Sequence, residues 1–161
     1  WVYHPRALPF AVPAAVTHMA ALRGMEVVVL RPEGYALPRA LMQKAARAAA
    51  LSGGSIRETS ERADALYAAD VVYAKEWGAT DVYGDVAADA LLRGALHDWC
   101  VRDDWFVGTG AECRLMHCLP VRRNTAVADE VLDGARSIVQ QQAHNRLTVQ
   151  MAVLHQMLQG V

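Results

Sequence analysis

The sequence predicts an α/β fold: a Rossmann-like, doubly wound parallel sheet of about five strands flanked by helices. Along its 161 residues, short apolar runs alternate with segments of helical spacing, which is typical of βαβ units. The run Val27–Leu30 is apolar at every position, as expected of a strand buried on both faces. Apolar residues make up 53% of the chain and charged residues 20%, a balance that supplies a core and excludes a disordered chain.

Glycine and proline mark the ends of the first elements. Gly24 ends a helix expected over 13–23, because glycine readily adopts the left-handed conformation that follows a helix. The strand at 27–30 comes next. Pro38 opens a second helix, since proline fits the first helical turn, and Gly53-Gly54 ends that helix.

The rest of the chain continues the alternation. The expected elements are a strand at 55–57, a helix at 60–69, a strand at 70–74, a long loop at 76–88, a helix near 88–96 and a strand at 115–117. The last helix has the clearest pattern, a single apolar stripe formed by Leu147, Met151, Leu154 and Leu158. Residues 1–3 also have strand character, so we expect that the sequence starts inside a strand and that part of a longer protein is missing.

Composition excludes several classes of protein. The net charge of −1 leaves no basic excess for non-specific nucleic-acid binding. No apolar run is long enough to span a membrane, and no signal peptide is visible. The cysteines Cys100, Cys113 and Cys118 form no CxxC pair, which fits a reducing cytoplasm better than a disulfide scaffold.

In doubly wound sheets, ligands bind beyond the carboxyl ends of the strands, so the segments after strands carry the candidate sites. The densest polar cluster, residues 117–124, follows an expected strand and contains His117, Cys118 and the adjacent Arg122 and Arg123. Arginine binds phosphate and carboxylate groups with paired hydrogen bonds. An anion-binding loop built on Arg122 is therefore one interpretation, and a solvated loop with a surface arginine pair is the other.

Two further interpretations of this cluster are weaker. A zinc site formed by Cys113, His117 and Cys118 matches no common ligand spacing and lacks an evident fourth ligand. A Cys118 nucleophile with His117 as its base is disfavoured, because neighbouring side chains on a strand point to opposite faces. Nucleotide binding at 108–110 is also disfavoured, since the third glycine of the dinucleotide motif is missing.

Three residues outside the cluster are further candidates. Lys75 ends an expected strand and is placed either to bind a ligand carboxylate or to extend into solvent beside Glu76. Arg146 lies off the apolar stripe of the last helix, where an exposed arginine is the simpler interpretation. His4 follows the first expected strand, and a lone histidine there is more often structural than catalytic.

Residues 117–120, His-Cys-Leu-Pro, resemble the HCLP signature of the ornithine carbamoyltransferase family. The segments 4–9 (HPRALP), 73–77 (YAKEW), 116–124 and 145–146 narrow the resemblance to the N-acylornithine branch, the N-acetylornithine and N-succinylornithine carbamoyltransferases. These matches cover nearly the whole chain in the family's order and spacing.

The resemblance implies a cytoplasmic two-domain enzyme of arginine biosynthesis. Residues 1–161 resemble its second, ornithine-binding domain. The first domain binds carbamoyl phosphate through a Ser-x-Arg-Thr motif, which this chain lacks, so we expect that domain to be absent here. The resemblance also implies a homotrimer with shared active sites, and neither an organic cofactor nor a metal.

The resemblance assigns residue roles as well. It implies that His117, Arg122 and Arg146 bind carbamoyl phosphate, with Arg122 also catalytic. Cys118 and Leu119 are expected to line the site beside the carbamoyl group and the substrate δ-amine, without the thiol forming a covalent bond.

In the family, the Leu119-Pro120 peptide is cis and turns the Leu119 carbonyl towards the reacting amine. Lys75 corresponds to the lysine that binds the α-carboxylate or acyl end of the substrate.

The chain departs from the family pattern at two places. Ala14-Ala15 stands where the family has an Asn-Ser pair, and Ala126 lies near a lysine position of the acetyl branch. The missing lysine, with the segments 32–35 and 116–124, favours the succinyl branch slightly. Ala14-Ala15 leaves two alternatives open: a carbamoyltransferase for a different amine, and a non-catalytic binding or assembly module that kept the fold.

Overall fold

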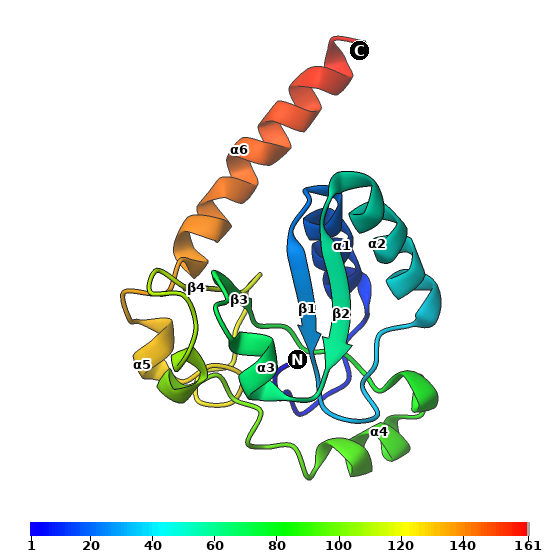
Figure 1. Ribbon diagram of the computed structural model, residues 1–161, viewed down its shortest axis with the longest axis vertical. Coiled ribbons are helices and arrows are strands. Elements are labelled where there is room, and N and C mark those ends of the chain that lie inside the picture. Colours follow the sequence, from blue (N-terminus) through cyan, green and yellow to red (C-terminus); the bar gives the residue numbers. More distant parts are fainter. Residues whose placement is uncertain (161) are drawn as a thin grey trace.

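The computed structural model describes residues 1–160 and shows an α/β body from which one long helix extends (Figure 1). In the body, β1 (Glu26–Leu30) pairs in parallel with β2 (Ser55–Thr59). Likewise, β3 (Val71–Tyr73) pairs in parallel with β4 (Arg114–Met116). Parallel strands alternating with helices confirm the predicted fold class.

The prediction of one sheet with about five strands needs correction. The described residues form four strands in two separate two-stranded sheets, β1-β2 and β3-β4. Residues 1–3 are not a strand, although single long-range hydrogen bonds hold them: the Trp1 amino group donates to Leu30 O, and Val2 N donates to Lys75 O at 3.1 Å.

Six α-helices and two 3-10 helices accompany these strands. They are α1 (Ala11–Leu22), α2 (Arg39–Ser52), α3 (Arg62–Leu66), α4 (Val86–Arg93), α5 (Asp129–Leu132), α6 (Val139–Leu158), η1 (Thr80–Val82) and η2 (Asp103–Phe106). The elements predicted after residue 10 occur in the predicted order with slightly different boundaries, whereas α5 and the two 3-10 helices were not predicted. For example, α4 begins earlier than predicted, because the Asp85 carboxylate caps it by accepting hydrogen bonds from Ala87 N and Ala88 N.

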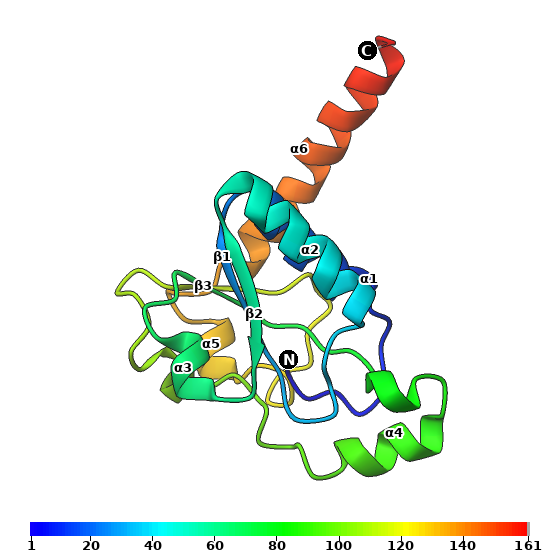
Figure 2. The same ribbon diagram turned by 45° about the vertical axis from the view of Figure 1, so that its right-hand side comes forward.

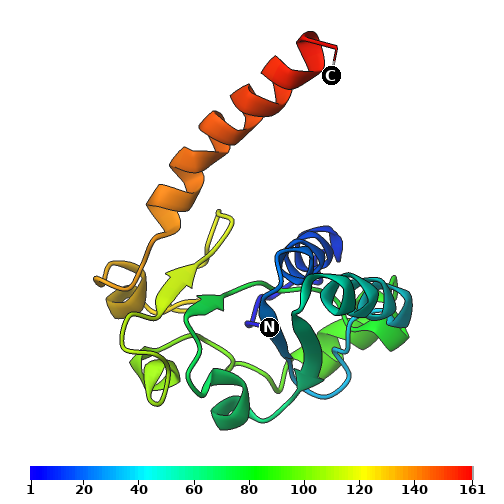
Figure 3. The ribbon, with the colours of Figure 1, turned by 45° about the horizontal axis from the view of Figure 1, so that its top comes forward.

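The helices α1 and α2 pack against each other beside β1 and β2, with α3 on the other side of these strands (Figures 2 and 3). Alanines make this close approach feasible, since Ala21, Ala45 and Ala49 form a buried cluster between the two helices. Gly24 is required at the end of α1: its φ is +72°, and a Cβ there would lie 2.7 Å from Ser52 O. Gly53 ends α2 in the left-handed conformation, as predicted.

Helix α6 is the exception to this packing. It begins at the buried Val139 beside β4 and extends away from the body (Figures 1 and 3). The four side chains of its apolar stripe are 58–87% exposed. The stripe has the predicted spacing, but nothing in residues 1–160 covers it. No helix within these residues combines the length and the hydropathy needed to cross a membrane.

Candidate functional site

The candidate site lies where β3 and β4 end. These strands are parallel neighbours, with Tyr73 paired to Met116, so the segments that follow them leave the sheet at the same edge. Lys75 and Glu76 come from the first segment and His117 from the second. Sheet topology thus brings together residues that are more than 40 positions apart in the sequence.

A buried ionic cluster occupies this edge. Lys75 Nζ donates to Glu76 Oε1 at 3.0 Å, and Glu76 Oε2 lies 3.7 Å from His117 Nε2. All three residues are at most 9% exposed. The alternative in which Lys75 extends into solvent is therefore wrong, because its side chain is buried. A buried ammonium group needs a carboxylate partner, and Glu76 provides it.

Glu76 is ionised in this setting. Burial alone would raise its pKa, but the contact with His117 and the positive charge of Lys75 lower the pKa to about 2. The sequence analysis treated Glu76 only as a neighbour of Lys75 and missed its second contact, with His117. The adjacent pair Lys75-Glu76 at the end of an apolar strand was the available signal.

Hydrogen bonds fix the proton positions on His117. Its Nδ1 accepts a hydrogen bond from Leu119 N at 2.9 Å, so the proton of the neutral ring is on Nε2, which faces Glu76. The Nε2 atom is buried beside Glu76 and has no hydrogen-bond partner within residues 1–160, and no hydrogen bond joins either ring nitrogen to the Cys118 thiol. This arrangement removes the interpretation in which His117 activates Cys118 as a nucleophile.

Gln142 connects α6 to both strands and was not predicted from the sequence. Its Oε1 accepts a hydrogen bond from His117 N at 3.0 Å, and its Nε2 donates to the Tyr73 hydroxyl at 3.0 Å. Arg146 lies one helical turn further along α6, and its Nη2 donates to Cys118 O at 3.1 Å. The first turns of α6 thus hold both the start of the loop and the end of β3.

The Leu119-Pro120 peptide is cis, as the resemblance implied, and Leu119 has a φ of +52°. Cys118, unlike Cys100 and Cys113, is partly exposed. These residues form the corner at which the loop turns from the buried cluster towards the arginines.

The adjacent arginines of the loop have different surroundings. Arg123 is held by Asp129 and Asp133, each at 2.7 Å, so its guanidinium serves the local structure. Arg122 Nε donates to His4 Nε2 at 2.9 Å, and the two Nη groups of Arg122 have no partner within residues 1–160. Arg122 is thus the loop arginine that is free to bind an anion.

His4 reaches the site through this contact, although its sequence position suggested a structural role only. Its Nδ1 lies 2.9 Å from Arg6 O, which makes Nε2 the acceptor for Arg122. The zinc interpretation is not supported: Cys113 is buried in the core, and residues 1–160 contain no group of three or more His, Cys, Asp or Glu able to hold a metal ion.

Comparisons with known proteins agree with this geometry. Residues 12–157 match the family model described as the Asp/Orn binding domain of aspartate/ornithine carbamoyltransferase. N-acetylornithine carbamoyltransferase of Xanthomonas campestris is 36% identical over 155 residues, which cover 96% of this chain and 45% of that protein. N-succinylornithine carbamoyltransferase of Bacteroides fragilis is 33% identical over 163 residues, covering 100% of this chain and 46% of the relative.

Solved structures give the same result. The crystal structure of acetylornithine transcarbamylase complexed with acetylcitrulline superposes with a TM-score of 0.91 at 36% identity, covering 96% of this chain and 46% of that one. The chain thus spans about half the length of the relatives it matches. The match in sequence and in structure leads to one conclusion: the chain belongs to the aspartate/ornithine carbamoyltransferase family and corresponds to its Asp/Orn-binding domain.

Proposed function

We propose that this chain is the amino-acid-binding half of an N-acylornithine carbamoyltransferase and acts together with a carbamoyl-phosphate-binding domain. In the proposed reaction, the substrate δ-amine attacks the carbonyl carbon of carbamoyl phosphate. A C–N bond forms, the C–O bond to phosphate breaks, and the amine loses a proton. The observation that carries the proposal is that one loop at the strand ends contains Arg122, accepts a hydrogen bond from Arg146 at Cys118 O, and contacts the Lys75-Glu76 pair through His117.

Arginine side chains supply the charge that this reaction needs. Phosphate leaves as an anion, so fixed guanidinium groups beside it lower the energy of the transition state. Arg122 offers two unpaired Nη groups for this role, and Arg146 is held against the loop by its bond to Cys118 O. His117 acts with them by holding the Leu119 backbone in place. Positioning and electrostatics, rather than a covalent intermediate, carry the proposed mechanism.

Lys75 is the proposed contact for the carboxylate or acyl end of the amino acid. An ammonium group has three donors, and Glu76 uses one of them, which leaves two for a substrate. Glu76 also supplies the carboxylate partner of the buried Lys75. Cys118 and Leu119 would then line the space between this end of the substrate and the arginines.

We also propose that N-succinylornithine is preferred slightly over N-acetylornithine. The support is the absence of the acetyl branch's lysine near Ala126, which is buried here. The relatives from the two branches have similar sequence identity to this chain, 36% and 33%, so overall similarity does not decide the acyl group. Operation as a homotrimer in the cytoplasm, within arginine biosynthesis, belongs to the same proposal.

The test is an assay of the full-length protein with carbamoyl phosphate and a panel of amines. The panel contains N-succinylornithine, N-acetylornithine, ornithine and unrelated primary amines. We expect turnover with an N-acylornithine, and none by the isolated 161-residue chain. Turnover only with another amine would support the alternative suggested by Ala14-Ala15, and turnover by the isolated chain would contradict the division into two domains.

A further inference from the structure

Helix α6 follows directly from a segment that pairs with β4. Leu115 N donates to Arg136 O at 2.8 Å, and Ile138 N donates to Leu115 O at 3.0 Å. The first residue of α6, Val139, comes next and is buried. The start of this helix is therefore fixed on β4, just before the loop at 117–124 begins.

Gln142 continues this pairing where the backbone partner ends. In a parallel strand, every second residue bonds to the same side, so His117 N faces the same side as Leu115 N. The chain beside it has by then become helical, and the helix uses its carbonyl groups internally. Gln142 Oε1 instead accepts the hydrogen bond from His117 N, at 3.0 Å. A side-chain amide thus provides the partner that this backbone N–H needs.

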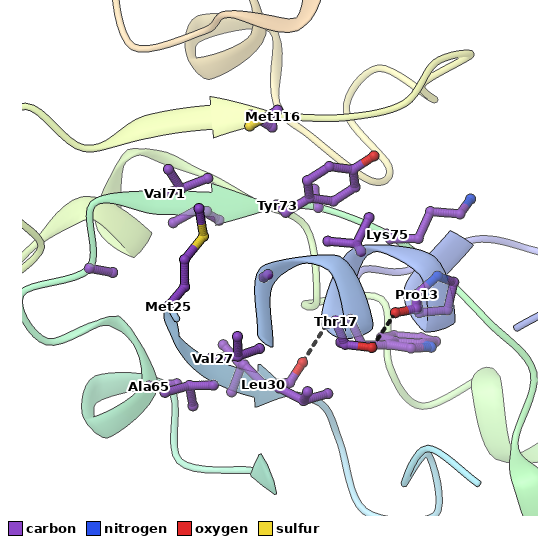
Figure 4. A pocket seen from close by; sticks show the side chains of 18 of the residues that line it. Pro13, Thr17, Met25, Val27, Leu30, Ala65, Val71, Tyr73, Lys75 and Met116 are labelled. Carbon is purple, nitrogen blue, oxygen red and sulfur yellow. Dashed lines mark hydrogen bonds between the residues drawn. The ribbon is translucent and has the colours of Figure 1, made fainter. Parts of the chain in front are cut away.

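The other end of the same amide holds β3. Gln142 Nε2 donates to the Tyr73 hydroxyl at 3.0 Å. Figure 4 shows Tyr73 at the end of β3, beside Met116 at the end of β4. Burial and the neighbouring Cys118 both raise the pKa of Tyr73, so the hydroxyl keeps its proton while it accepts from Gln142. Tyr73 therefore connects Gln142 with the Cys118 side chain.

Arg146 adds a contact on the same face of α6. Side chains four residues apart lie one above the other on a helix, so Gln142 and Arg146 both face the loop. They bond to consecutive residues of it, because Gln142 accepts from His117 N and Arg146 Nη2 donates to Cys118 O at 3.1 Å. Two contacts one helical turn apart determine how the loop lies along α6.

We propose that Gln142 is a positioning residue for carbamoyl transfer: its amide fixes the start of the loop at 117–124 and keeps Cys118 and Arg146 aligned in the site. This inference rests on the proposed function, in which Arg146 and Cys118 line that site. Glutamine suits the role because one amide combines an acceptor for a backbone N–H with a donor for a hydroxyl. Gln142 acts through these two partners and not on a substrate.

The neighbouring glutamine provides a matched control. Gln141 is exposed, so Gln141→Ala removes the same side chain from the same helical turn without removing a contact to the loop. In the full-length protein, Gln142→Ala should lower kcat by about tenfold relative to Gln141→Ala, because the loop loses its fixed start. Gln142→Glu keeps an acceptor for His117 N and should recover part of this loss.

Cysteine reactivity measures the position of the loop independently of the reaction. Cys118 is partly exposed, whereas Cys100 and Cys113 are buried. Relative to Gln141→Ala, Gln142→Ala should speed alkylation of Cys118 by iodoacetamide at least about threefold and leave the two buried cysteines unchanged. Mass spectrometry of the labelled peptides from the full-length protein gives the three rates separately.

An unchanged kcat or an unchanged Cys118 rate in Gln142→Ala would overturn the proposal. Faster alkylation of all three cysteines would also overturn it, because that pattern indicates general loss of stability and not a shift of the loop. If the unsubstituted full-length protein transfers no carbamoyl group, the proposed function fails. The Cys118 rate then still decides whether Gln142 positions the loop.

Discussion

The loop at 117–124 and helix α6 are neighbours with opposite patterns of exposure: the loop begins with a buried polar side chain, and most of α6 exposes apolar side chains. At the start of the loop, His117 is buried among polar partners. Along most of α6, apolar side chains such as Leu154 and Leu158 are exposed. The first turns of α6 belong to the polar network through Gln142 and Arg146. The change from polar contacts to exposed apolar side chains therefore occurs within a single helix.

This difference determines how the residues of each region contribute to stability. The buried polar groups of the loop are supported by backbone and carboxylate partners, and removing one partner would leave another unsatisfied. The apolar stripe of α6 buries little area within residues 1–160, so its side chains contribute little to the stability of this part of the fold. Substitutions in the two regions should therefore differ measurably in their effects on stability and on activity.

The largest expected effect contrasts two leucines. Leu115, on β4, is completely buried, whereas Leu154, on α6, is 58% exposed. Leu115→Ala should lower the free energy of unfolding of the 161-residue chain by about 2–5 kcal/mol, because it leaves a cavity. Leu154→Ala should change it by less than about 0.5 kcal/mol. Urea unfolding measures both, and equal losses would show that the stripe is covered.

The next effect concerns the adjacent arginines and rests on the proposed function. In the full-length protein, Arg122→Ala should lower kcat/KM by about tenfold to a hundredfold, because a charge-assisted contact is lost. Thermal unfolding should be nearly unchanged, since Arg122 lies outside the core. Arg123→Ala is the matched control and should affect activity less, because Asp129 and Asp133 occupy its guanidinium. The reverse order of effects would contradict the assignment.

A smaller effect is the pH dependence of stability caused by Glu76. Its pKa is about 2 in the folded chain against an ordinary value of 4.5. The stabilisation is therefore complete above about pH 4.5 and lost as the pH falls towards 2, because the unfolded chain takes up the proton first.

Urea unfolding between about pH 6 and pH 3 measures this dependence. Glu76→Gln should reduce its slope more than Asp133→Asn does, since solvent screens the exposed Asp133 pair. Identical slopes in the two variants would show that Glu76 is not the responsible group.

The smallest effect is expected at Cys118. If the thiol lines the site without forming a covalent bond, Cys118→Ser should keep kcat/KM within about tenfold of the unsubstituted full-length protein. The geometry supports this expectation, because His117 Nδ1 accepts from Leu119 N and its Nε2 faces Glu76 rather than the thiol. Loss of several orders of magnitude would instead indicate covalent catalysis.

The sequence by itself determined the parts of this protein that depend on local chemistry. Val27–Leu30 could be assigned as a strand because it is uniformly apolar, and the ends of α1 and α2 because glycine adopts the left-handed backbone of Gly24 and Gly53 most readily. Strand order along the chain also placed Lys75 and His117 after strands, and therefore at a sheet edge.

Only the tertiary structure decided which side chains meet. Arg122 and Arg123 are adjacent arginines that the local sequence does not distinguish. In the folded chain, Arg122 bonds to His4, whereas Arg123 bonds to Asp129 and Asp133. Gln142 is one of three consecutive glutamines, and nothing in that run distinguishes the one that bonds His117 and Tyr73.

The same holds for the apolar surfaces. The spacing of the α6 stripe predicted an apolar face, but burial depends on whether another element lies against that face. The division into two sheets likewise depends on which strands pair, and the order of the strands along the chain does not fix that. The spacing of apolar residues shows which side chains of a segment share a face. Whether that face or a strand edge is covered depends on other segments, which are distant in sequence and come close only on folding.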